Sequence, residues 1–160
     1  MASYHPELVH FAVALLIVGV IFRLVSLAGR PAFAGPAALT LLAAGTVAAA
    51  LSVYSGVAAH GPVERIPGAR PAVVEHEEWG IRTRNVFIGV MILEMAALAL
   101  WRSRRQRTVY IASAALGVVG LACLYEAGEH GGKLVYAYAG GIGTRSGDPA
   151  DVGRLLLAGL

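Results

Sequence analysis

The sequence predicts an all-α integral membrane protein: a bundle of four transmembrane helices followed by a short tail outside the membrane. Three observations lead to this prediction. Hydrophobic residues make up 57% of the 160 residues and charged residues only 14%, whereas soluble domains carry about 25% charged residues. Four apolar segments are each close to the ~20 residues that cross a bilayer as a helix. These segments are rich in Ala and Gly, which let neighbouring helix backbones approach closely.

The four segments define the elements in order. They cover residues 6–28, 36–59, 80–101 and 108–128. Backbone groups in lipid must form their hydrogen bonds internally, so we expect each segment to be a helix. One transmembrane domain over residues 1–143 accounts for all four.

Proline and glycine mark the connections and the tail. The middle connection, residues 61–79, is the longest, and Pro71 is expected to open a helical extension that leads into the third span. The glycine-rich segment 131–143 is expected to lie along the membrane surface. Asp148-Pro149 predicts a short amphipathic helix within the C-terminal tail, residues 144–160.

Arginine in the third connection gives an orientation. Short arginine-rich loops stay on the cytoplasmic side, so both chain termini are expected on the other side, the periplasm of a bacterium. The chain would then be a multi-pass protein of the bacterial inner membrane. The net charge is +3, and no aromatic-plus-basic pattern indicates a nucleic-acid partner. The arginines are Arg102, Arg104, Arg105 and Arg107.

All five histidines are expected near one side of the membrane. An antiparallel bundle brings the starts of spans one and three beside the ends of spans two and four. Neutral imidazole binds iron, zinc and copper, and helix bundles build cofactor sites from facing helices. We therefore expect a shared cofactor site; the alternative is a separate interfacial role for each ring. The five residues are His5, His10, His60, His76 and His130.

A repeated spacing adds geometry to this expectation. Eighteen residues separate His5 from Arg23, and eighteen separate His76 from Glu94. Since eighteen residues complete five helical turns, each pair shares one helix face. Spans one and three run in the same direction, so His5 could face His76. Arg23 could then form a structural ion pair with Glu94 inside the bundle; alternatively, Arg23 extends to the nearby interface.

Other signals are weaker. Glu126 and His130 share a face four residues apart, so the carboxylate could orient the imidazole. Cys123 is the only cysteine and is expected to be a packing residue. Nucleophile–base pairs, phosphate loops and zinc-protease motifs are not found, so an enzyme acting alone is not expected.

Two motifs resemble those of bacterial membrane proteins classed as domain of unknown function 2231. The opening His5-Pro6-Glu7-Leu8-Val9-His10-Phe11 resembles that family's His-Pro-x-x-Val-His-Phe. Gly131-Gly132-Lys133-Leu134-Val135-Tyr136, with the later Gly140-Gly141-Ile142-Gly143, resembles its Gly-Gly-x-Leu-Val-Tyr closing motif. His76-Glu77-Glu78-Trp79-Gly80-Ile81 is similar, with altered spacing, to a His-x-Trp-x-Gly element of some relatives. The resemblance covers roughly residues 5–143.

The resemblance implies membrane electron transfer. Relatives are similar to modules fused to, or encoded beside, cytochrome c and Rieske-type domains. By that analogy His5, His10, His76 and His130 are candidate cofactor ligands, and topology adds His60. The candidates for binding haem iron itself are His10, His60, His76 and His130.

The sequence therefore favours a haem b-binding subunit similar to cytochrome b, with one or two haems. It would pass electrons between a redox partner protein, or subunits of a respiratory or photosynthetic complex, and a quinone in the lipid bilayer. The alternative is a non-catalytic membrane anchor or assembly subunit without its own cofactor. A zinc- or copper-handling protein is a third reading.

Overall fold

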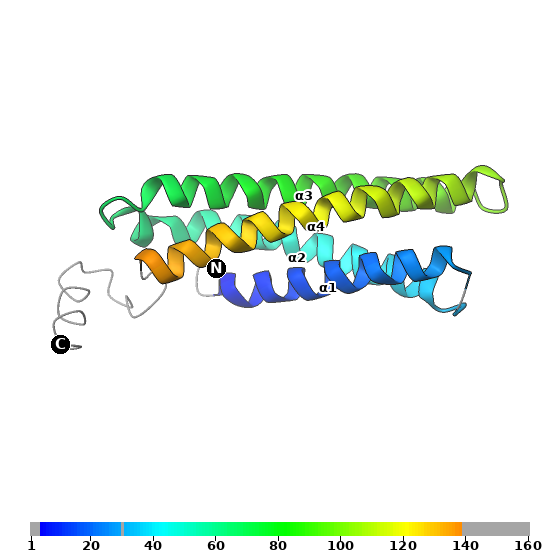
Figure 1. Ribbon diagram of the computed structural model, residues 1–160, viewed down its shortest axis with the longest axis horizontal. Coiled ribbons are helices and arrows are strands. Elements are labelled where there is room, and N and C mark those ends of the chain that lie inside the picture. Colours follow the sequence, from blue (N-terminus) through cyan, green and yellow to red (C-terminus); the bar gives the residue numbers. More distant parts are fainter. Residues whose placement is uncertain (1–3, 30, 139–160) are drawn as a thin grey trace.

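Four helices make up the structure, a computed structural model that describes residues 4–29 and 31–138, except for the side chains of His60 and Pro62. The helices are α1 (His5–Leu27), α2 (Ala34–Glu64), α3 (Arg70–Ala99) and α4 (Arg105–Tyr138). They lie roughly along one long axis and form an antiparallel bundle (Figure 1).

Proline and glycine set several helix ends. Proline occupies the first turn of both α1 and α3, where its missing N–H has no helical partner to lose. The turns that follow α1 and α2 contain Gly29 and Gly68, with φ of 85° and 83°. Glycine adopts this left-handed conformation without steric cost, so both turns can be short.

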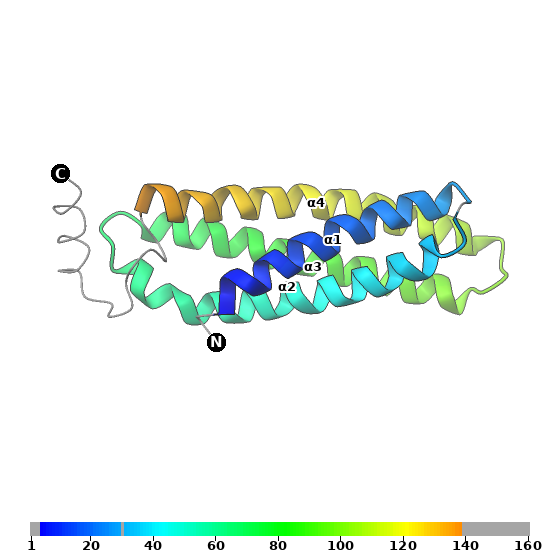
Figure 2. The same cartoon turned by 90° about the horizontal axis from the view of Figure 1, so that it is seen from below.

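The bundle consists of two hairpins, α1–α2 and α3–α4. The most extensive contacts are within these hairpins, and α2 with α3 and α1 with α4 complete the ring. The α1–α2 and α3–α4 turns lie at one end, which we call the arginine end (Figure 2). The opposite end, where α1 and α3 begin and α2 and α4 finish, is the histidine end.

Three helices are long and apolar enough to cross a membrane: α1, α2 over Ala34–Ala59, and α4. Large apolar side chains such as Phe11, Val47 and Ile92 lie exposed on the outside of the bundle. Such a surface suits a lipid environment. The fourth helix, α3, is less apolar because it contains Arg82, Arg84 and Glu94, yet it packs against α2 and α4 as part of the same bundle.

Glycine allows the closest helix approaches within each hairpin. A Cβ on Gly45 would lie 2.7 Å from Leu16, and a Cβ on Gly120 would lie 2.8 Å from Phe87. Both large partners are fully buried. Small residues at interfaces are the usual means of packing membrane helices.

The two hairpins share one pattern of interior positions, which reveals an internal repeat that the sequence alone does not make evident. In α1 and α3 the equivalent positions are His5, Ala12, Leu16, Gly19 and Arg23, and His76, Thr83, Phe87, Val90 and Glu94. In α2 and α4 they are Ala38, Leu42, Gly45, Ser52 and Gly56, and Ser113, Gly117, Gly120, Ala127 and Gly131. Spacing and chain direction agree, so positions of one hairpin can be compared with equivalent positions of the other.

The helices extend further than the predicted spans at the histidine end. Only Arg65–Ala69 connect α2 to α3, so the predicted long connection is mostly helical. Residues 131–138 continue α4 and do not lie along the surface. Interior glycine costs a helix about 1 kcal/mol relative to alanine, and packing against the bundle offsets this cost. The predicted tail helix lies outside the described residues.

Candidate functional site

The imidazole rings of His5 and His76 meet at the histidine end. His5 comes from α1 and His76 from α3, which occupy opposite corners of the bundle. Their ring centroids are 6.3 Å apart and the planes are nearly perpendicular, at 82°. Imidazole nitrogens bind metal ions at about 2.0 Å, so two imidazoles on opposite sides of one ion hold their centroids roughly 6 Å apart. The centroid separation of the pair is close to this value.

Hydrogen bonds fix the tautomer of both rings. His5 Nδ1 lies 3.0 Å from the Ser52 carbonyl oxygen and 3.1 Å from Ser55 Oγ, and His76 Nδ1 lies 2.9 Å from the Ala127 carbonyl oxygen. A carbonyl oxygen only accepts, so Nδ1 carries the proton in each ring. In a neutral ring the lone pair is then on Nε2.

Each imidazole ring packs against a glycine of the neighbouring helix. A Cβ on Gly56 would lie 3.1 Å from His5 Cε1, and a Cβ on Gly131 would lie 3.0 Å from His76 Cε1. Each glycine follows the residue that supplies the carbonyl by four positions, which is one helical turn. The two rings are thus held in the same way by the two hairpins.

His130 occupies a different environment beside this pair. Its Nδ1 donates to the Glu126 carbonyl at 2.8 Å, and its Nε2 lies 3.4 Å from Glu75 Oε2. The Glu126 carboxylate approaches Nδ1 at 3.9 Å, and the Trp79 ring lies 6.5 Å away between centroids. Oxygen atoms of Glu126 and Glu75 thus face the two nitrogens of this ring.

The two remaining histidines do not join the ring pair in the described structure. His10 is exposed on the outside of α1, and its Nδ1 donates to the Pro6 carbonyl at 2.6 Å. His60 belongs to α2 at the histidine end, but its side chain lies outside the described part of the chain.

A buried ion pair links the same two helices nearer the arginine end. Arg23 donates from Nε to Glu94 Oε1 at 2.8 Å and from a terminal nitrogen to Glu94 Oε2. Arg23 also donates to Ser26 Oγ, Ser113 donates to the carboxylate, and the Tyr110 ring lies 4.1 Å from the guanidinium carbon. Both charged side chains are buried, so Arg23 turns into the bundle and not toward the interface.

The ring pair offers two imidazole donors from two different helices. Among residues 4–29 and 31–138 there is no cluster of three or more His, Cys, Asp or Glu side chains suited to a metal ion. Zinc sites use three or four protein ligands, whereas haem iron needs only axial ligands from the protein.

Sequence reasoning missed the residues that hold the rings. The carbonyls of Ser52 and Ala127 carry no sequence signal, because every residue has a carbonyl. Gly56 and Gly131 were detectable as interior helix glycines, but only the register between helices shows what they contact.

A comparison with protein-family models shows to which family the chain is related. The family described as predicted membrane protein (DUF2231) matches residues 2–144. The chain belongs to this family. The match spans all four helices of this DUF2231 protein and confirms the resemblance seen in its opening and closing motifs. No curated protein and no solved structure matches the chain.

Proposed function

We propose that this DUF2231 protein is a haem b-binding electron-transfer subunit and that His5 and His76 are the two axial ligands. One observation carries the proposal: two imidazoles from opposite helices lie 6.3 Å apart, and each donates Nδ1–H to a backbone carbonyl. Among the histidines whose side chains the structure describes, the proposal takes His5 and His76 as ligands and leaves out His10 and His130.

Haem would supply a one-electron carrier, and the chain would tune it. Hydrogen bonds from Nδ1 orient the imidazoles and raise their basicity toward iron. Burial within an apolar bundle and the choice of axial ligands set the reduction potential. Gly56 and Gly131 keep the space beside each ring open, since a methyl group there would press on the ring.

The proposal extends to location. The exposed arginines of the α3–α4 turn favour a cytoplasmic arginine end, which puts the histidine end at the periplasmic face of a bacterial inner membrane. A redox partner protein or complex subunit would dock at that end, and a membrane quinone would be the second partner.

Purified full-length protein from haem-replete cells tests the ligand assignment. We expect a Soret band, a haem b pyridine haemochrome and a sharp α-band on reduction. His5→Ala and His76→Ala should each lower haem content at least about tenfold, because removal of one axial ligand destroys the pair. His10→Ala, on the same helix as His5 but exposed, is the matched control and should keep haem and spectrum.

Three other results would contradict the proposed function or its ligand pair. Protein without a Soret band that contains stoichiometric zinc or copper would make it a metal-handling protein. Protein with neither haem nor metal that co-purifies with a larger complex would make it an anchor or assembly subunit. Loss of haem in His10→Ala but not in His5→Ala would overturn the ligand pair.

A further inference from the structure

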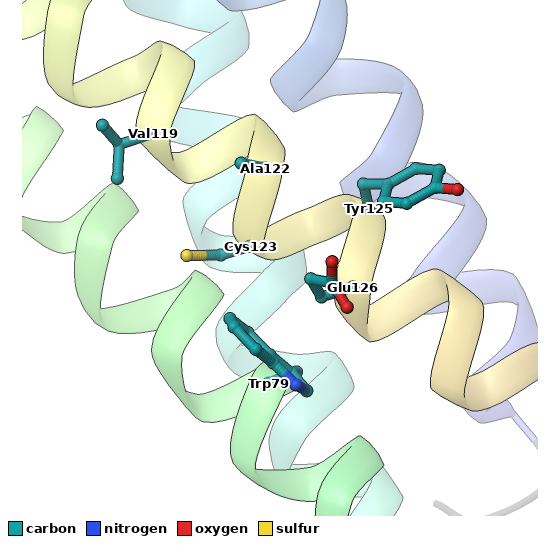
Figure 3. A pocket seen from close by; sticks show the side chains of 6 residues that line it. All are labelled: Trp79, Val119, Ala122, Cys123, Tyr125 and Glu126. Atoms are coloured by element: carbon teal, nitrogen blue, oxygen red, sulfur yellow. The ribbon is translucent and has the colours of Figure 1, made fainter.

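A groove of about 520 Å³ runs along the outer surface between α3 and α4, beside the ring pair. In Figure 3, Trp79 of α3 and Glu126 of α4 border the same space, and the apolar residues continue along α4 toward the middle of the bundle. Apolar surface dominates the lining, and Glu126 provides its carboxylate. The lining residues are Trp79, Val119, Ala122, Cys123, Tyr125 and Glu126.

The equivalent positions of the first hairpin carry different side chains. The hairpins match at interior positions, so an outer position of α3–α4 can be compared directly with its equivalent in α1–α2. The first hairpin has only aliphatic residues where the groove has Trp79, Tyr125 and Glu126. Those equivalents are Leu8, Ala50 and Leu51. The groove is thus a specialisation of one hairpin.

Polar groups form a chain from the groove to the histidine end. The Glu126 carboxylate lies 3.9 Å from His130 Nδ1, and Glu75 lies 3.4 Å from His130 Nε2. The side chain of His130 is 13% exposed, whereas that of Glu75 is 60% exposed. The His130 imidazole therefore lies between a carboxylate that lines the groove and a carboxylate that is exposed to water.

One lining residue of the groove is close in sequence to the ring pair: Trp79 follows His76 by about one helical turn.

The charged side chains at the groove indicate which kind of membrane-soluble molecule it binds. The Glu126 carboxylate, which lines the groove, disfavours a phospholipid phosphate there. Arg82 stacks on Trp79 at 4.5 Å, but Glu78 already pairs with it. A neutral aromatic head group with hydroxyl donors and an apolar tail fits both the carboxylate and the apolar remainder.

From this combination we infer that the α3–α4 groove binds the head group of a membrane hydroquinone, with a hydroxyl donating to Glu126 and the tail following Cys123 and Val119. This inference rests on the proposed function for its biological role, since it names the site of the quinone partner. Binding itself does not require haem.

A photoreactive azidohydroquinone with a short isoprenoid tail, kept in its reduced form, tests the site on the full-length protein in lipid nanodiscs. We expect peptide mapping to place the label at Trp79 and residues 119–126, and excess decylubiquinol to suppress it. Glu126→Leu installs the residue of the first hairpin's equivalent position, so the fold should tolerate it, and labelling should fall about tenfold. Glu64→Leu, the same change at an exposed carboxylate of α2 outside the groove, is the control and should label as the parent does.

Label spread evenly over the lipid-facing helices, or unchanged in Glu126→Leu, would overturn the groove assignment. Competition by anionic phospholipid as strong as that by decylubiquinol would also overturn it. The Soret absorbance of the same sample separates the two proposals. Specific labelling of haem-free protein would support the groove and refute the haem, and haem-loaded protein without specific labelling would do the reverse.

Discussion

At the residue scale, the buried Arg23–Glu94 pair shows how the interior tolerates charge. Each carboxylate oxygen accepts from Arg23, and Ser113 adds another donor. Within the described residues, every buried side-chain nitrogen and oxygen has a hydrogen-bond partner. A buried ion pair contributes little net stability compared with apolar residues, but one partner left alone is costly.

The ion pair therefore predicts non-additive mutations. Arg23→Leu and Glu94→Leu should each lower the unfolding free energy by about 3–5 kcal/mol, because the remaining charge is buried and unpaired. The double variant should lose much less than the sum of the single losses. Unfolding by SDS titration in mixed micelles measures all three variants. Additive losses would show that the two side chains do not act as a pair.

At the element scale, glycine positions on α4 differ sharply in what surrounds them. The Cβ position of Gly131 is 3.0 Å from the His76 ring, whereas that of Gly128, one turn earlier, has no neighbour within 4 Å. The same substitution should therefore have opposite effects at two positions of one helix.

Gly131→Ala should displace the His76 ring and lower thermal stability, because its methyl group requires the ring to move. Gly128→Ala should raise stability by up to about 1 kcal/mol, because alanine favours helix and nothing obstructs it. Melting temperatures of the two variants and of the parent protein test both predictions, whether or not a cofactor is bound. Equal effects would mean that the helix contact at Gly131 is not as described.

The sequence predicted helices more reliably than it predicted their ends. Long apolar segments locate four helices because lipid admits little else. The glycines of 131–138 hide the end of α4, because neighbouring helices, which local sequence does not report, stabilise it. Similarly, the eighteen-residue spacing placed His5 toward His76 and Arg23 toward Glu94. It could not rank His5 above His10, because both belong to one motif and their ring contacts depend on α2.

At the scale of the whole molecule, the two ends of the bundle differ in character. The arginine end exposes Arg102, Arg104, Arg105 and Arg107, whereas the histidine end gathers the imidazoles and carboxylates. Arginine-rich short loops are retained in the cytoplasm. This difference predicts that the arginine end faces the cytoplasm.

Single-cysteine labelling tests that direction. In a Cys123→Ser background, which should not react, Pro67→Cys marks the α2–α3 turn and Ser103→Cys marks the α3–α4 turn; both positions are exposed. We expect a membrane-impermeant maleimide to label position 67 in intact spheroplasts and position 103 only after permeabilisation. The reverse pattern would place the histidine end in the cytoplasm.

The internal repeat has a mechanical consequence. Each polar pair across the bundle takes one member from each hairpin: His5 with His76 at one end, and Arg23 with Glu94 toward the other. Because these two contacts are far apart along the interface between the hairpins, they oppose sliding or rotation of one hairpin relative to the other. If only the His5–His76 contact opened, the Arg23–Glu94 ion pair would still join the two hairpins and act as a hinge. The hairpins could then move apart at the histidine end without separating.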